Sequence, residues 1–158
     1  MESTAVKPRK TLSFVSSRLV KEKSVKYAPE ITSADDAIDC IKEHLSGYDR
    51  EVFGALYLSV RGKVNNASVV SIGTMTYANV HPREVFRSAI LAGAAAMILY
   101  HMHPSGDPTP SDGDVEATER LCRAGDLMGI KVLDHVIITD DKTFAMRSDG
   151  RYRNIFSK

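Results

Sequence analysis

Two histidines and a carboxylate lie close together in the segment HMHPSGDPTPSDGD, which covers residues 101–114. Zinc in hydrolytic sites usually takes three protein ligands from histidine, aspartate or glutamate, and it leaves one position for water, whose pKa it lowers to about 7. Side chains two residues apart on an extended backbone point to the same side. His101 and His103 can therefore converge on one ion, while Met102 between them points away into packing.

The loop PSGDPTP, residues 104–110, connects the histidines to the start of a predicted helix. Its prolines fix the backbone angle φ, and Gly106 permits a sharp reversal of the chain. Asp114 falls in the first turn of that helix, where the helix dipole stabilises a carboxylate that leans toward a cation. The candidate metal ligands are therefore His101, His103 and Asp114.

Each of these residues also has an ordinary structural interpretation. Ser111 and Asp114 fit a variant of the capping box, which explains both residues by helix initiation alone. A histidine after a buried strand is more often a hydrogen-bonded structural residue than a ligand. The combination of two histidines on one side, a rigid loop and a carboxylate at the next helix start favours a metal site, but residue chemistry alone leaves both interpretations open.

Three further polar residues are weaker candidates. His81 precedes Pro82 at a predicted helix start, and His135 lies in an apolar strand. Either histidine could orient a metal ligand, but structural roles are favoured for both. Asp107 could swing toward an ion, yet its GDP context is also plain turn chemistry. None of the three enters the candidate ligand set.

The elements that must position these residues follow from hydrophobic periodicity, which predicts an α/β (α+β) domain of order αββαβαββ. Helices are expected in residues 33–47, 81–94 and about 112–128, and strands in residues 51–60, 64–73, 96–100, 131–139 and 143–147. The strand at 96–100 is short and apolar, so it is expected to be buried and central. His101 follows it directly, at the carboxyl end where α/β proteins place their chemistry.

Composition indicates one globular domain with a basic amino-terminal arm. The chain has 158 residues, of which 43% are hydrophobic and 26% charged, and its net charge is +1. These values are ordinary for a single globular domain. Residues 1–27 hold seven basic and two acidic groups, which leaves a net charge of −4 on the rest of the chain. We interpret residues 1–30 as the arm and residues 31–158 as the domain.

The basic arm and the cysteines bear on the partners and the cellular compartment of the protein. A solvated tail is favoured for the arm over a weak contact with nucleic acid or an acidic partner. Cys40 and Cys122 lie in predicted helices without a CxxC spacing, which fits a reducing cytoplasm. The chain begins without the apolar segment of a signal peptide, and its longest apolar run, AILAGAAAMILY, is shorter than the ~20 residues that a membrane helix needs. We therefore expect a cytoplasmic protein with no membrane contact.

The candidate site carries a resemblance to a known family. His101, His103, Ser111 and Asp114 match HxHx7SxxD, the signature of the JAMM (MPN+) zinc metalloprotease superfamily. Further segments resemble the RadC-like JAB/MPN branch of that superfamily: HPSGDPTPS, VHPREVF (80–86), AILAGAAAMIL and LDHVIIT (133–139). The resemblance covers roughly residues 49–152, and the separated segments agree in order. It implies a cytidine-deaminase-like, JAMM-type mixed β-sheet flanked by helices, with zinc held by the two histidines and the aspartate.

The resemblance also implies catalytic residues. The family pattern requires a glutamate on an early strand, and Glu51 of REVFGALYL occupies that place. From the residues alone Glu51 is only a charged residue at a strand start, with which Glu84, Glu116 and Glu119 compete. Carried over, Glu51 is the general base and Ser111 hydrogen-bonds the oxyanion at the scissile carbonyl. The implied function is zinc-dependent metallopeptidase hydrolysis of a peptide or isopeptide bond in an unidentified protein or peptide substrate.

Two departures from the family pattern bear on function. Met102 stands where RadC-like sequences usually have asparagine, which removes a polar group but no ligand. Only the basic arm stands where longer RadC proteins carry a helix-hairpin-helix DNA-binding domain, so the resemblance gives little support to DNA binding. The alternative function is a non-catalytic or accessory RadC-type factor in DNA repair or recombination. The intact ligand set argues against a degenerate scaffold, because binding alone does not require it.

Overall fold

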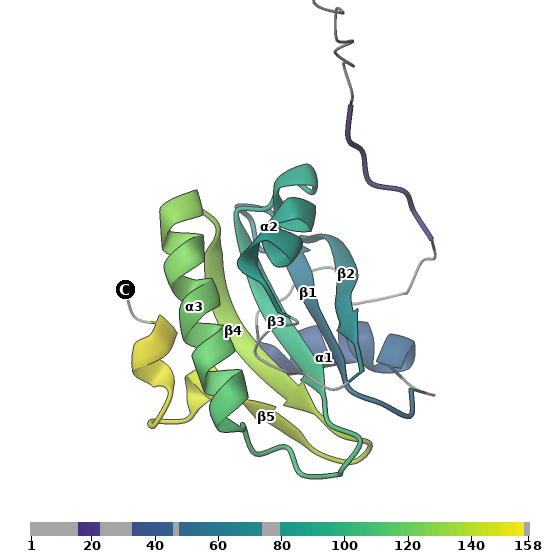
Figure 1. Ribbon diagram of the computed structural model, residues 1–158, viewed down its shortest axis with the longest axis vertical. Helices are drawn as coiled ribbons and strands as arrows, with labels where there is room; N and C mark the ends of the chain where they lie inside the picture. The colour runs from purple at the N-terminus through teal and green to yellow at the C-terminus, as the bar shows by residue number, and fades with distance from the viewer. Residues whose placement is uncertain (1–15, 23–32, 46–47, 74–79, 157–158) are drawn as a thin grey trace, which may run out of the picture.

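The computed structural model describes residues 16–22, 33–45, 48–73 and 80–156 (Figure 1). In chain order the elements are α1 (Ala34–Leu45), β1 (Val52–Leu58), β2 (Val64–Ile72), α2 (Pro82–Leu91), β3 (Ala96–Met102), α3 (Asp112–Met128), β4 (Lys131–Ile138), β5 (Thr143–Ala145), and the 3-10 helices η1 (Met146–Ser148) and η2 (Arg153–Phe156). The predicted order αββαβαββ is confirmed.

Most of the expected basic arm lies outside the described residues, so both the favoured solvated tail and the alternative of weak contact with nucleic acid stay predictions. Within the arm, residues 16–22 are exposed and form neither helix nor strand. None of the helices in the described parts of the chain combines the length and apolarity needed to cross a membrane.

One mixed sheet of five strands, in the order β2-β1-β3-β4-β5, forms the centre of the α/β domain. β3 and β4 pair in parallel, and the other neighbouring strands pair antiparallel. Parallel strands need a crossover connection, and α3 provides it between β3 and β4. Figure 1 shows α1 on one face of the sheet and α2 and α3 on the other.

The two faces of the sheet bury separate apolar clusters because successive side chains of a strand alternate between faces. Ile98, Tyr100 and Met102 of β3 pack in the cluster under α1. Met97 and Leu99 pack in the cluster under α2 and α3. The face that a residue of β3 occupies therefore follows from whether its number is odd or even.

The first two helices begin as their sequences predict. Ser33 caps α1. Its hydroxyl accepts from the backbone N–H of Asp36 at 3.2 Å, and the backbone N–H of Ser33 donates to the Asp36 carboxylate at 3.0 Å. His81 caps α2 through Nδ1, which accepts from the backbone N–H of Arg83 at 3.2 Å, and Pro82 fills the first turn. The structural role favoured for His81 is thereby confirmed.

All five strands differ from the sequence-based expectation by one or two residues at an end, and β1 covers only Val52–Leu58. Tertiary contacts explain the ends of β3 and β5. β3 runs two residues further, through His101 and Met102, because β1 and β4 pair with both residues from either side. β5 ends at Ala145 rather than at residue 147. There the chain turns into η1, where Met146 is fully buried and the backbone N–H of Arg147 donates to the Asp134 carboxylate at 2.9 Å.

Candidate metal centre

Strand β3 presents the two histidines to the side of the sheet that α3 covers. His101 is the last but one residue of β3 and is 2% exposed. His103 follows the strand, and its backbone N–H still donates to the carbonyl of Ile138 on β4, at 2.8 Å, which keeps the chain extended. Met102 packs on the opposite face, in the cluster under α1. The predicted alternation, with both histidines on one side and Met102 on the other, is confirmed.

The first turn of α3 brings Asp114 to the histidines. Ser111 and Asp114 form a complete capping box, in which the Ser111 hydroxyl accepts from the Asp114 N–H at 3.2 Å. The Asp114 carboxylate in turn accepts from the Ser111 backbone N–H at 2.8 Å and from its hydroxyl at 2.6 Å. The capping interpretation and the metal interpretation therefore hold together, because the cap aims the fully buried carboxylate at the histidines.

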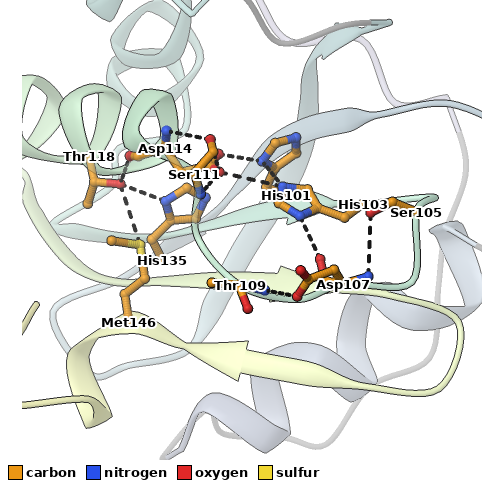
Figure 2. Close-up of polar contacts among 10 residues, drawn as sticks. All are labelled: His101, His103, Ser105, Asp107, Thr109, Ser111, Asp114, Thr118, His135 and Met146. Carbon is orange, nitrogen blue, oxygen red and sulfur yellow. Dashed lines mark hydrogen bonds and ion pairs between the residues drawn. The ribbon is translucent and has the colours of Figure 1, made fainter. Parts of the chain in front are cut away.

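One donor atom from each of His101, His103 and Asp114 lies within 4.8 Å of the other two (Figure 2). His101 Nδ1 donates to Asp114 Oδ1 at 2.7 Å, and His103 Nε2 lies 3.2 Å from His101 Nδ1 and 3.5 Å from Asp114 Oδ2. Two imidazoles and one carboxylate are a donor set that zinc accepts in open hydrolytic sites. His101 Nε2 is also buried without a hydrogen-bond partner among the described residues. The residues present thus fit a divalent metal ion.

The electrostatics of the cluster keep Asp114 ionised. Burial raises the pKa of Asp114, but hydrogen bonds and charge from His101 and His103, together with the Ser111 hydroxyl, outweigh it and hold that pKa well below its usual range. The hydrogen bond to Asp114 also raises the pKa of His103. A buried carboxylate beside two imidazoles is a centre of negative charge that a cation would stabilise.

The loop between the histidines and α3 fixes the tautomer of His103. His103 Nδ1 lies 2.9 Å from the backbone carbonyl of Asp107, and because a carbonyl only accepts, Nδ1 must carry the hydrogen. His103 Nε2 is then unprotonated in the neutral ring, the state a metal ligand needs. Gly106 makes the reversal with φ of 79°, and the Asp107 carboxylate accepts from the Thr109 N–H at 2.9 Å. Asp107 therefore acts as a turn residue, the role its context favoured.

Glu51 lies beside the cluster without being one of its three ligands. The antiparallel register pairs Val52 with Met102, which brings Glu51, one residue earlier, alongside His103, one residue later. Glu51 is half-buried, and its charge contributes to the raised pKa of His103. The structure thus brings Glu51 into the surroundings of the candidate ligands, although 50 to 63 residues of sequence separate it from them.

His135 and Thr118 complete the buried polar surroundings of the cluster (Figure 2). His135 is fully buried, its ring is stacked on that of His101 with centroids 6.3 Å apart, and burial lowers its pKa to about 3. The Thr118 hydroxyl lies 2.7 Å from His135 Nδ1 and 2.6 Å from the Asp114 carbonyl. Sequence reasoning missed Thr118, although its position four residues after Asp114 on one helix places both on the same face.

Comparison with known proteins identifies the family. The RadC-like JAB domain family matches residues 31–151, which is most of the chain. The chain belongs to the RadC-like JAB domain family. Among curated relatives, a UPF0758 protein of Desulforudis audaxviator is 44% identical over 126 residues, 80% of this chain and 55% of that protein. A UPF0758 protein of Caldanaerobacter subterraneus subsp. tengcongensis is 46% identical over 122 residues, 77% of this chain and 52% of that protein.

The match covers only part of each relative. A UPF0758 protein of Methanosarcina acetivorans is 40% identical over 124 residues, 78% of this chain and 54% of that protein. This RadC-like JAB chain therefore spans about half the length of the curated relatives it matches. Family membership confirms the resemblance drawn from the histidine motif and its neighbouring segments.

Proposed function

We propose that this RadC-like JAB domain is a zinc-dependent hydrolase of peptide or isopeptide bonds. The observation that carries the proposal is the convergence of His101, His103 and Asp114, with donor atoms within 4.8 Å of one another. Zinc held there would supply the Lewis acidity that makes water nucleophilic at neutral pH. The ligands lie at the end of β3 and in the capped first turn of α3, and sites built on such elements are better preorganised than sites on loops.

Two residues of the chain would handle the proton and the oxyanion. Glu51, alongside His103, would take a proton from the attacking water and deliver it to the leaving amine. Ser111 is exposed, and its hydroxyl donates to the Asp114 carboxylate at 2.6 Å. To stabilise the oxyanion, that hydroxyl would turn from Asp114 to the scissile carbonyl of a bound substrate.

The metal is tested first by elemental analysis of the purified chain. The expected result is one zinc ion per chain in the wild type and none in the His101→Ala/His103→Ala variant. The Met102→Leu variant is the matched control, because Met102 lies between the two histidines but packs on the other face of the sheet. Zinc retained by the double histidine variant would remove the basis of the proposal.

Hydrolysis is tested separately with two probes, a proteome-derived peptide library and a set of lysine-branched isopeptides. The zinc-loaded wild type should create new amino termini that mass spectrometry identifies. Glu51→Gln should keep stoichiometric zinc and lose cleavage by a factor of about 10²–10⁴, the usual contribution of a general base. Glu116→Gln, which changes an exposed glutamate of α3, is the matched control.

The two readouts separate the parts of the proposal. Equal cleavage by Glu51→Gln and the wild type would refute Glu51 as the base and leave the metal centre standing. Failure of the zinc-loaded wild type to cleave either probe would count against a peptide hydrolase.

A further inference from the structure

His135 of β4 is a buried histidine in contact with the surroundings of the metal centre. It is 0% exposed, and its ring lies 6.3 Å from that of His101 with 22° between the planes. The Phe53 ring meets it edge-on at 5.6 Å. Burying the two ring nitrogens of a histidine costs free energy that an apolar side chain of similar size would not cost. A buried histidine at this position therefore suggests a role beyond packing.

The hydrogen positions around Thr118 define the state of the His135 ring. The Thr118 hydroxyl has one hydrogen, and the Asp114 carbonyl, 2.6 Å away, can only accept it. The hydroxyl oxygen then accepts from His135 Nδ1, at 2.7 Å. His135 is thus the Nδ1–H tautomer, and its Nε2 is unprotonated and has no partner among the described residues.

This chain of hydrogen bonds joins the sheet to the helix turn that carries a ligand. His135 belongs to β4, next to the strand that carries His101, whereas Thr118 and Asp114 belong to α3. The Thr118 hydroxyl also lies 3.8 Å from the Met146 sulfur, so it is enclosed on three sides (Figure 2). A shift of the first turn of α3 along the sheet would break these contacts and move the Asp114 carboxylate relative to the histidines.

We propose that His135 is a positioning residue for the metal centre, which acts through Thr118 to hold Asp114 at the distance where all three ligands meet. The inference rests on the metal centre of the proposed function. Residues that orient metal ligands through hydrogen bonds typically contribute about 10–100-fold to metal affinity. His135 would contribute in this way without touching the ion, and its unpartnered Nε2 is a cost to stability that the role explains.

Two substitutions of His135 separate positioning from packing. His135→Phe keeps a planar ring but removes the donor to Thr118, whereas His135→Asn keeps a donor at the place of Nδ1 and removes Nε2. Zinc affinity is measured by competition with a chromophoric chelator, and the site geometry by the absorption spectrum of the cobalt-substituted chain. The thermal stability of each metal-free variant is measured in parallel.

The expected pattern is a change in affinity without a matching change in stability. His135→Phe should bind zinc about 10–100-fold more weakly, with an altered cobalt spectrum, while the metal-free chain is at least as stable as the wild type. His135→Asn should keep most of the affinity, because the bond to Thr118 remains. Thr118→Val, which removes the hydroxyl at constant shape, should weaken zinc binding like His135→Phe, and the double variant should be no weaker than either single one.

The control is Val136→Ala, the neighbouring residue of β4, which is buried in the cluster under α1. It should lower thermal stability and leave zinc affinity unchanged. Unchanged zinc affinity in His135→Phe and Thr118→Val, or equal losses in His135→Phe and His135→Asn, would overturn the inference and leave the metal centre in place. If His135→Phe does not fold, Thr118→Val and His135→Asn decide the question. A wild-type chain that binds neither zinc nor cobalt would overturn both the metal centre and this inference.

Discussion

The same strands contribute to an apolar core on one face of the sheet and to a polar site on the other. Under α1, Tyr100 and Met102 of β3 and Val136 of β4 pack in an apolar cluster. On the face that α3 covers, the neighbouring positions at the same end of the sheet are buried polar residues, among them His101 and His135. Burial costs a polar group free energy unless it is paired. The candidate site therefore lies where the capped start of α3 supplies Asp114 as the partner of the buried His101 imidazole.

Substitutions of neighbouring residues of β3 test most strongly whether the two faces of the sheet act independently. His101→Ala should abolish stoichiometric zinc binding, because it removes one of three ligands. Met102→Ala should instead cost about 2–5 kcal/mol of unfolding free energy, as buried methionine truncations do, and keep zinc in the folded chain. Elemental analysis and denaturant unfolding check the pair. Loss of zinc in Met102→Ala at a temperature where the chain is folded would show that the two faces are not independent.

The tight packing of the α1 face gives the second prediction. A Cβ added at Gly54 of β1 would collide with the Tyr100 ring and with the backbone carbonyl of Ser68. Gly54→Ala should therefore lower the free energy of unfolding by about 1–3 kcal/mol, the usual cost of overpacking. Urea denaturation measures the change, and zinc affinity of the folded fraction should not move. If Gly54→Ala were as stable as the wild type, the packing of Tyr100 and Ser68 around Gly54 would have to be looser than in the structure.

The stability of the metal-free chain should depend on pH through two residues on the α3 face of the sheet, Asp114 and His103. Since the pKa of Asp114 is lower in the folded chain than in the unfolded one, its contribution to stability is present above about pH 4 and is lost as pH falls through the folded value. The pKa of His103 is raised, so its contribution is present below about pH 6.5 and is lost as pH rises through the folded value. Unfolding free energies from pH 2 to 9 check both signs.

The matched variant for the pH series is Asp114→Asn. It should flatten the dependence at both ends, because it removes the titrating carboxylate and with it the main cause of the raised pKa of His103. A wild-type profile that rises as pH falls below 4 would contradict the sign derived for Asp114. Val136→Ala should lower the whole profile and keep its shape, since Val136 does not titrate.

The smallest expected effect concerns the two buried cysteines. Cys40 lies in the cluster under α1, and Cys122 lies in the cluster under α2 and α3. Burial, and then the charges of Asp126 and Glu119, raise the pKa of Cys122 to about 12, and burial raises that of Cys40. Both thiols should resist alkylation at pH 8 in the native chain and react after unfolding. Each stabilises the fold below about pH 8.5, and this contribution is lost as pH rises, because the unfolded thiols ionise first. Mass spectrometry after iodoacetamide treatment measures the labelling. Rapid native labelling of either cysteine would contradict its burial.

Much of the site could be predicted because it depends on local periodicity. The spacing of two between His101 and His103 fits one face of a strand, and Ser111 with Asp114 fits a helix start, so the sequence predicts the candidate ligand set without any knowledge of contacts. The extension of β3 through His101 was not predicted, since it depends on pairing with β1 and β4. The end of β5 likewise depends on the bond from Arg147 to Asp134, thirteen residues away in the chain.

The amino-acid sequence alone predicts the elements, their order, the side of β3 on which each of its residues lies, and the RadC-like family. These properties follow from periodicity and motif, which are local in the chain. Tertiary packing, in contrast, places Glu51 alongside His103 and connects His135 to Asp114 through Thr118. Strand register and helix placement set those contacts, and both result from packing between residues that are far apart in the sequence.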